Sequence, residues 1–265
     1  QALLVRGTAL PTGGGGGGYV VVFDDITRLI AAQRSAAWGE VAQRLAHEIK
    51  NPLTPIQLSA ERLQMKLADK LEPTSRAMLD RSIATIVTQV EAMKNMVNDF
   101  RDYARTPPPS LAAVDLDALV REVLALYEAT TPRVEATLAP ALPRVRGDAN
   151  QLRQVLHNLI KNAAEALAEH GAAPSLFAGE GPRVLVATRS EDRRVALVVA
   201  DNGPGFPPQI LARAFEPYVT TKPRGTGLGL AIVRKIVDEH HGEIHLGNRN
   251  GGGAEISIRL PIAET

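Results

Sequence analysis

The sequence predicts an α-helical hairpin that forms a dimeric four-helix bundle with a second copy, followed by an α/β sandwich domain. Three observations predict this fold class. Amphipathic helical patterns run from about residue 28 to residue 104. A proline-rich stretch at residues 106–109 ends them and supplies a stiff linker. Beyond it, strand-like and helix-like segments alternate to the C-terminus. We therefore divide the chain into residues 1–27, 28–106 and 111–265.

The composition bounds what the chain does. With 265 residues, 45% of them apolar, it can bury about two cores. Its 30 basic and 29 acidic residues leave a net charge of +1, which argues against a nucleic-acid surface. The absence of cysteine excludes disulfides and thiol catalysis and fits a reducing cytosol.

No apolar run approaches the ~18 residues of a membrane span, and no secretory signal is visible. The chain begins with Gln1 rather than Met, so it reads as a piece of a longer protein. We expect the chain to lie in the cytoplasm, either as a cytoplasmic protein or as the cytoplasmic part of an inner-membrane protein. A membrane would be reached only through a segment absent from this chain.

Residues 1–27 read as two short strands, Ala2–Arg6 and Tyr19–Phe23, joined through six glycines, Gly13–Gly18. Two strands are not stable alone. They fit the remnant of an upstream sensory domain, with residues 24–27 as the junction to a helix. A hairpin with no sensory role is the open alternative.

The next segment predicts a helical hairpin. A first helix at about residues 28–69 carries an apolar stripe that we expect to be buried, made of Leu45, Ile49, Leu53, Ile56, Ala60, Leu63 and Leu67. Residues 71–73 break it. A second helix follows with a heptad seam of Leu79, Ile83, Ile86, Val90, Met93, Val97, Phe100 and Ala104. One hairpin leaves its stripe half covered, so we expect a homodimer.

His47 lies off this stripe, about 200° around the helix from its neighbours Leu45 and Ile49, and should face solvent. A buried core histidine is therefore disfavoured. A neutral imidazole is a good nucleophile near neutral pH, and the adjacent Glu48 can orient the ring or take its proton. His47 is thus a candidate phosphate acceptor. Pro52 should kink the helix just beyond it.

The second domain alternates strands and helices. We predict helices at 116–127, 150–169 and 228–240, and strands at 133–138, 184–190, 195–200, 243–246 and 254–260. Mixed strands with helices on one face form an α/β sandwich.

Three groups of residues in this domain suit nucleotide chemistry. Asn158 and Asn162, one turn apart on a helix, offer oxygens to a hard cation such as Mg²⁺, although paired asparagines are often only solvated. Asp201 ends an apolar strand, where a carboxylate can accept a hydrogen bond from an adenine-like amine. Gly203 and Gly205 let the backbone approach a flat base, or simply form a tight turn.

The third group opens the last helix, where free N–H groups and the helix dipole favour phosphate. It comprises Gly225, Thr226, Gly227, Leu228 and Gly229. The pattern is neither a Walker loop nor a dinucleotide fingerprint.

In this order the motifs resemble the H, N, G1, F and G2 boxes of the sensor histidine kinases over about residues 28–262. They are His47-Glu48-x-x-Asn51-Pro52, Asn158-x-x-x-Asn162-Ala163, Asp201-x-Gly203-x-Gly205, Phe215-Glu216-Pro217-Tyr218 and Gly225-x-Gly227-x-Gly229. The residues 53–56 and 218–222 are most similar to the nitrogen-regulation sensors of the NtrY type.

The resemblance implies an ATP-binding second domain and the roles that follow. Residues 1–27 lie outside it, and their two strands fit the remnant of a PAS-like sensory domain. His47 would be the phosphoacceptor and Glu48 its base. Asn162 would be the Mg²⁺ ligand, with Asn158 lining the same site, and Asp201 would read adenine. The stretch Gly225–Gly229 would face phosphates at the end of a mobile lid, and Lys222 in that lid would meet the γ-phosphate.

The predicted activity is ATP-dependent autophosphorylation of His47 and transfer to an aspartate on the receiver domain of a response regulator. Asn51, one turn after His47, can hold a water for hydrolysis of the phospho-aspartate, so we also expect regulator phosphatase activity. The alternatives are an ATPase of the same nucleotide fold that works by closure, and a non-catalytic dimeric scaffold. The exposed His47–Glu48 pair counts against the first, and the intact nucleotide motifs count against the second.

Overall fold

The computed structural model describes residues 2–9, 19–105, 107–128, 132–169, 181–222, 225–250 and 252–263. They belong to two compact units, residues 1–106 and 107–265. The predicted glycine turn, Gly13–Gly18, lies outside the described residues.

The first unit begins with a two-stranded antiparallel sheet. Strands β1 (Leu3–Ala9) and β2 (Tyr19–Asp25) pair from Leu3 opposite Asp25 to Ala9 opposite Tyr19, and both are longer than predicted. Their apolar side chains are largely exposed, Tyr19 to 80%. Thr27 closes the hairpin onto the next helix, because its N–H donates to Asp25 Oδ1 (2.9 Å) and its Oγ1 accepts from the Ala2 N–H (2.8 Å).

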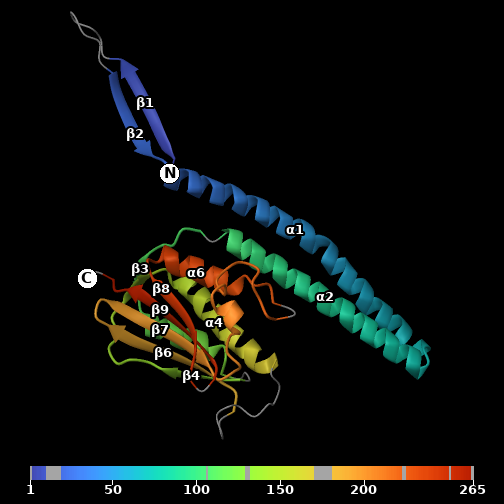
Figure 1. The fold of residues 1–265 in the computed structure, drawn as a ribbon. Coiled ribbons are helices and arrows are strands. Elements are labelled where there is room, and N and C mark those ends of the chain that lie inside the picture. The colour runs from blue at the N-terminus through green and yellow to red at the C-terminus, as the bar shows by residue number, and fades with distance from the viewer. Residues whose placement is uncertain are drawn as a thin grey trace, which may run out of the picture. The chain divides into compact units, whose positions relative to one another are not determined.

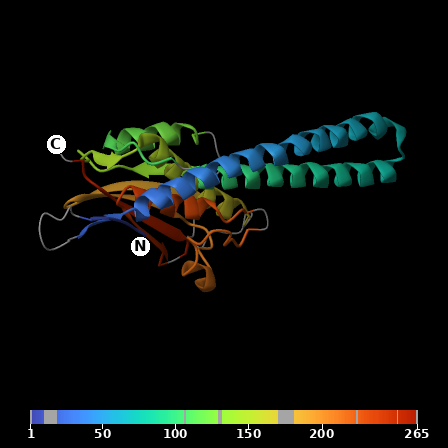
Figure 2. The ribbon, with the colours of Figure 1, turned by 90° about the horizontal axis from the view of Figure 1, so that it is seen from above.

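Two long helices follow and run side by side as an antiparallel hairpin (Figures 1 and 2). They are α1 (Thr27–Leu67) and α2 (Pro73–Arg105), joined by the short 3₁₀ helix η1 (Ala68–Lys70). Helix α1 passes through Pro52 and Pro55 without interruption. In Figure 1 it curves gently along its length, where the sequence predicted a sharper kink.

The buried seam of the hairpin differs from the predicted stripe. Leu53 and Ala60 are buried as expected, but four larger stripe residues keep 39–52% of their surface exposed, namely Leu45, Ile49, Ile56 and Leu63. The small side chains of Ala42 and Ala46 take their place in the seam. They let α1 approach α2 closely, so the bulkier residues fall on an outer edge.

On α2 the heptad divides in the same way. One residue per heptad is buried against α1: Ile83, Val90, Val97 and Ala104. Between them, Ile86 and Met93 stay 40% and 48% exposed. The hairpin therefore carries two apolar seams, and the packing of a single chain uses one.

The second unit is an α/β sandwich. Its main sheet has the order β4-β6-β7-β9-β8, in which β4 and β6 are parallel and the other pairs antiparallel. These strands are β4 (Arg133–Thr137), β6 (Arg183–Glu191), β7 (Arg194–Asp201), β8 (Glu243–Asn248) and β9 (Ala254–Pro261). A separate pair joins β3 (Ala112–Val114) to β5 (Val145–Gly147).

The helices of this unit are α3 (Leu116–Ala125), α4 (Ala149–Glu169), α5 (Pro208–Leu211) and α6 (Gly229–Glu239). Helix α4 contacts α3, α6 and the centre of the sheet. Alternate residues of β9 are buried beneath the helices: Ala254, Ile256, Ile258 and Leu260. Each large aliphatic side chain fully buried here contributes about 1.5–3 kcal/mol. The core thus fixes α4 and α6, the two helices that carry predicted site residues.

His240, just after α6, is fully buried and joins α6 to the start of α4. Its Nδ1 lies 2.8 Å from the Ile236 carbonyl oxygen, and its Nε2 accepts a hydrogen bond from the Asp148 N–H at 2.9 Å. A carbonyl only accepts, so Nδ1 carries the proton and the ring is neutral. Burial lowers the pKa of His240 below its usual value, against smaller opposing effects of the Ile236 carbonyl and the Asp148 charge.

This geometry predicts acid destabilisation of the second unit. In the unfolded protein His240 takes up a proton near pH 6.5, whereas in the folded protein it does so only at lower pH. Between these two pKa values the unfolded protein therefore binds more protons. Stability should therefore fall as the pH decreases below about 6.5. Thermal unfolding of wild type and His240→Gln at pH 7.5 and 5.5 checks this. The variant should be less stable at pH 7.5 but should lose less on acidification, and an equal loss in both proteins would contradict the assignment.

Candidate functional site

The predicted phosphoacceptor lies on the exposed face of α1. His47 and Asn51 are exposed, whereas Ala46 beside them keeps only 2% of its surface in contact with solvent. Glu48 Oε1 accepts a hydrogen bond from Arg44 Nε at 2.9 Å, one turn earlier. Both of these side chains are well exposed, so the pair is weak. The imidazole is thus open to a partner, and the Glu48 carboxylate lies on the adjacent residue.

Asp201 ends β7 as a buried carboxylate with 7% exposure. Its Oδ1 accepts hydrogen bonds from the backbone N–H groups of Gly203 (2.8 Å) and Ala254 (3.2 Å). Burial raises the pKa of Asp201, while these two N–H groups and the charges of Arg249 and Lys222 act in the opposite direction. Both hydrogen bonds fall on one oxygen, so Oδ2 is the atom with acceptor capacity for a ligand.

The glycines around Asp201 are required by close packing. A Cβ on Gly253, whose φ is +91°, would overlap the Asp201 carbonyl oxygen. Gly205 has φ +74°, and a Cβ there would lie 2.7 Å from Asn248 Oδ1. Asn248 in turn bonds both the N–H and the carbonyl of Phe206, at 2.7 and 2.8 Å. The turn after β7 is therefore held from both sides.

The two predicted amides lie on α4, and Asn162 lies near the start of α6. A Cβ on Gly229 would sit 3.5 Å from Asn162 Nδ2. Asn158 Nδ2 is buried and makes no hydrogen bond within the described parts of the chain. An amide N–H₂ group that is buried without an acceptor is costly, so this group suits a ligand that offers an oxygen acceptor. Amide oxygens are ligands that suit Mg²⁺.

The glycine loop opens α6 as the sequence predicts. Thr226 Oγ1 accepts from the Leu228 N–H at 3.3 Å, and no side chain caps α6 itself. Gly227 has φ +68°, and a Cβ there would come within 2.7 Å of Tyr218 Cα. The Gly227 carbonyl accepts from the Tyr218 N–H at 3.1 Å. The N–H groups at the start of α6, which no side chain caps, therefore follow directly after a tightly packed loop.

Lys222 joins this group through α4. Its Nζ donates to Glu165 Oε2 at 2.7 Å and to the Asn162 carbonyl oxygen at 3.2 Å. The structure thus brings together Asn162, Gly229 and Lys222, and Lys222 also acts electrostatically on Asp201. His47, Glu48 and Asn51 belong to the other compact unit.

Three residues of this site were missed by sequence reasoning: Glu165, Asn248 and Gly253. Glu165 had a signal, because it lies three residues after Asn162 on the same helical face. Asn248 and Gly253 gave no such signal in the sequence, because they lie far along the chain from the turn that they hold.

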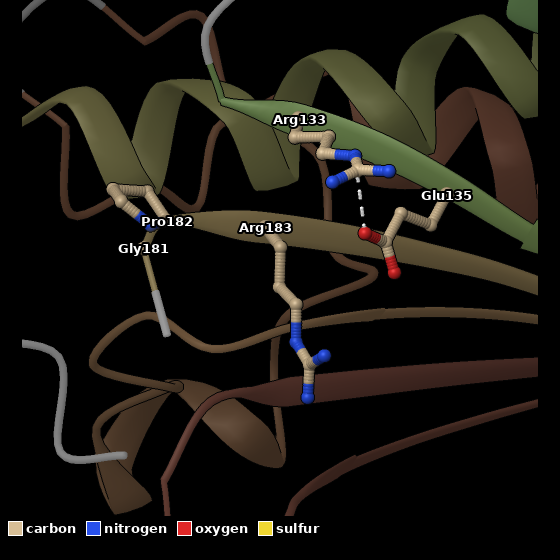
Figure 3. A pocket seen from close by; sticks show the side chains of 5 residues that line it. All are labelled: Arg133, Glu135, Gly181, Pro182 and Arg183. Atoms are coloured by element: carbon tan, nitrogen blue, oxygen red, sulfur yellow. Dashed lines mark ion pairs between the residues drawn. The ribbon is translucent and has the colours of Figure 1, made fainter. Parts of the chain in front are cut away.

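A pocket of about 300 Å³ lies elsewhere, at the start of β4 and β6 (Figure 3). Arg133 and Glu135, two residues apart on β4, form an ion pair at 3.2 Å, and Arg183 on β6 points away from that pair. None of the predicted site residues lines this pocket. The candidate site therefore rests on the packing of α4, α6 and the turn after β7.

Comparisons with known proteins show the family of this chain. The family model described as "His Kinase A (phospho-acceptor) domain" matches residues 37–108, and the model "Histidine kinase-, DNA gyrase B-, and HSP90-like ATPase" matches residues 147–264. The chain belongs to the sensor histidine kinases.

Within that family it is similar to the NtrY type. It is 44% identical over 240 residues to the nitrogen regulation protein NtrY of Azorhizobium caulinodans, covering 89% of this chain but 30% of that protein. The chain thus spans about a third of the length of this relative.

Two solved structures share the fold. ShkA in complex with AMPPNP is 30% identical, with a TM-score of 0.61, over 85% of this chain and 46% of that one. The histidine kinase ThkA in complex with the response regulator protein TrrA is 26% identical, with a TM-score of 0.60, over 98% of this chain and 75% of that one. Among the residues that the structure describes, no helix has the length and apolar character to cross a membrane.

The glycine loop gives a matched pair of substitutions. Gly227→Ala should strain the loop, because φ is positive and the new Cβ meets Tyr218. Gly229→Ala should be tolerated, because its Cβ makes an ordinary contact at the start of a helix. Hydrogen exchange at the Tyr218 amide is the measurement. We expect about tenfold faster exchange in Gly227→Ala only, and equal rates in the two variants would refute the packing described.

Proposed function

We propose that this chain is an ATP-dependent autokinase that phosphorylates His47 and passes the phosphoryl group to an aspartate of a response regulator. One observation carries the proposal. The same chain combines an exposed histidine beside a carboxylate on α1 with a second unit built around Asn162, Asp201 and the uncapped N-terminus of α6. The AMPPNP complex of ShkA supports an adenine nucleotide as the ligand.

Each group of the second unit has a proposed task in binding ATP. Oδ2 of Asp201 accepts a hydrogen bond from the exocyclic amine of adenine. The N–H groups at the start of α6 and the Lys222 ammonium bind phosphate oxygens. Asn162, with Asn158 beside it, would hold a Mg²⁺ ion, which supplies charge neutralisation at the β- and γ-phosphates.

The proposed reaction is an in-line transfer. The unprotonated ring nitrogen of His47 attacks the γ-phosphorus, a P–N bond forms, and the bond to the β,γ-bridging oxygen breaks so that ADP leaves. The proton on the other ring nitrogen passes to Glu48. The phosphoryl group then moves from His47 to a carboxylate oxygen of the regulator as the P–N bond breaks, and Glu48 returns the proton so that a neutral imidazole is left.

The alternatives have less support. A closure-driven ATPase has no use for the His47–Glu48 pair, and a scaffold has no use for the buried Asn158 Nδ2, which finds no partner among the described residues. The complex of ThkA with TrrA supports a response regulator as the partner class.

A homodimer is proposed from the second apolar seam on the hairpin, formed by Leu45, Ile49, Ile56, Leu63, Ile86 and Met93. A second hairpin would cover it as a four-helix bundle. Because ATP is a cytosolic nucleotide, we propose that both units work in the cytoplasm. Any membrane anchor would belong to a part of the protein outside this chain.

The phosphorylation assay tests the proposal directly. Incubation of wild type with γ-labelled ATP and Mg²⁺ should give a protein label that is labile in acid and stable in base, as a phosphoramidate is. His47→Gln should lose the label and keep nucleotide binding, because acceptor and nucleotide groups lie in different units. Acid-stable label on the wild type would contradict the assignment.

Asn51 gives the second test. Its exposed amide, one turn after His47, can hold a water in line with the phospho-aspartate of a regulator. Asn51→Ala should slow dephosphorylation of the regulator by about tenfold or more and leave autophosphorylation intact. Thr54→Ala, on the same exposed face, is the control. If the dephosphorylation rate is unchanged in Asn51→Ala, Asn51 is only a tolerated polar residue before Pro52.

A further inference from the structure

Lys222 is held against a helix, although it lies in a loop. Its side chain is only 18% exposed, and its ammonium donates to Glu165 Oε2 at 2.7 Å and to the Asn162 carbonyl at 3.2 Å. Both acceptors belong to α4. Glu165 precedes Lys222 by 57 residues and Asn162 precedes it by 60. The loop lysine is therefore tied to the helix that carries the two amides of the nucleotide site.

The place where Lys222 is held is the phosphate end of that site. The side chain of Asn162 lies beside Gly229, the first residue of α6. Asn162 is thus contacted on two sides, by the Lys222 ammonium at its main-chain carbonyl and by the start of α6 at its side-chain amide. Glu165 follows Asn162 by three residues, so it shares the same face of α4.

We propose that Glu165 is a positioning residue that holds the Lys222 ammonium ready for the γ-phosphate of ATP. This inference rests on the proposed function of the site. An ammonium has three N–H donors, and the two hydrogen bonds to α4 use two of them. The third can bind a phosphate oxygen without breaking either bond.

The energetic reason is preorganisation. A lysine side chain has a four-carbon stem and loses much rotamer freedom when it binds a ligand. A lysine that another residue already holds in place has lost that freedom before the ligand binds. A carboxylate suits this task because it accepts hydrogen bonds and cannot compete for phosphate itself. Glu165 keeps 42% of its side chain exposed, so solvent weakens its opposing charge toward the phosphates.

Lys161 supplies a matched control. Its Nζ lies 3.9 Å from the other oxygen of the same carboxylate, and its side chain is 51% exposed. Lys161→Ala removes a cation beside Glu165 without touching Lys222. This variant separates an effect of the Lys222–Glu165 contact from an effect of changing the net charge of α4.

The test compares the affinities of Mg·ATP and Mg·ADP for the full chain by calorimetry. Glu165→Ala should weaken Mg·ATP by about fivefold and Mg·ADP by less than about twofold, because only ATP has a γ-phosphate. Glu165→Gln, which keeps an acceptor oxygen, should recover part of the loss. In a Lys222→Ala background, Glu165→Ala should have no further effect on the ratio. Lys161→Ala should leave the ratio unchanged.

Three results would overturn the inference while leaving the proposed function intact: an unchanged ratio in Glu165→Ala, an equal loss for both nucleotides, or tighter binding of Mg·ATP. The last would mean that Glu165 blocks the site. A wild type that binds neither nucleotide would overturn this inference together with the proposed function.

Discussion

The nucleotide site depends on one buried carboxylate. Asp201 is 7% exposed at the end of β7, and it stays there because two backbone N–H groups bond its Oδ1. Those bonds come from Gly203 in the following turn and from Ala254 at the start of β9. One side chain therefore fixes the turn and the neighbouring strand together. Gly253 must be glycine for this contact, since a Cβ would overlap the Asp201 carbonyl. The uneven use of its two oxygens leaves Oδ2 for the hydrogen bond that we propose Asp201 accepts from adenine.

A second constraint acts in the helical unit, where the size of the side chains on α1 decides which of the two apolar seams packs within the hairpin. The small side chains of Ala42 and Ala46 bring α1 close to α2, and the larger Leu45 and Ile49 stay outside. The same rotation of the helix exposes His47. The exposure of His47, the proposed phosphoacceptor, and the exposed second apolar seam thus both follow from the same packing of α1 on α2. This is why the proposed dimer and the proposed chemistry are linked.

Much of this could be predicted from the sequence, because periodicity and ordered motifs are local signals. The long helices and the main strands of the second unit were confirmed with small shifts at their ends, and so was the exposure of His47. Three short elements, β3, β5 and α5, were missed because three or four residues give no periodicity. The stripe of α1 was confirmed in part, since Leu53 and Ala60 are buried. The helical period does not tell which partner covers the remaining residues of the stripe. The Lys222–Glu165 contact joins residues 57 apart, which no local pattern reports.

The most direct test of this account is the base preference of Asp201. Adenine carries an amine where guanine carries a carbonyl oxygen, which a carboxylate would repel. Calorimetry with Mg·ATP and Mg·GTP should show at least about tenfold tighter binding of Mg·ATP to the wild type, and Asp201→Asn should lose most of that preference. Equal affinity of the wild type for both nucleotides, or an undiminished preference in Asp201→Asn, would contradict it.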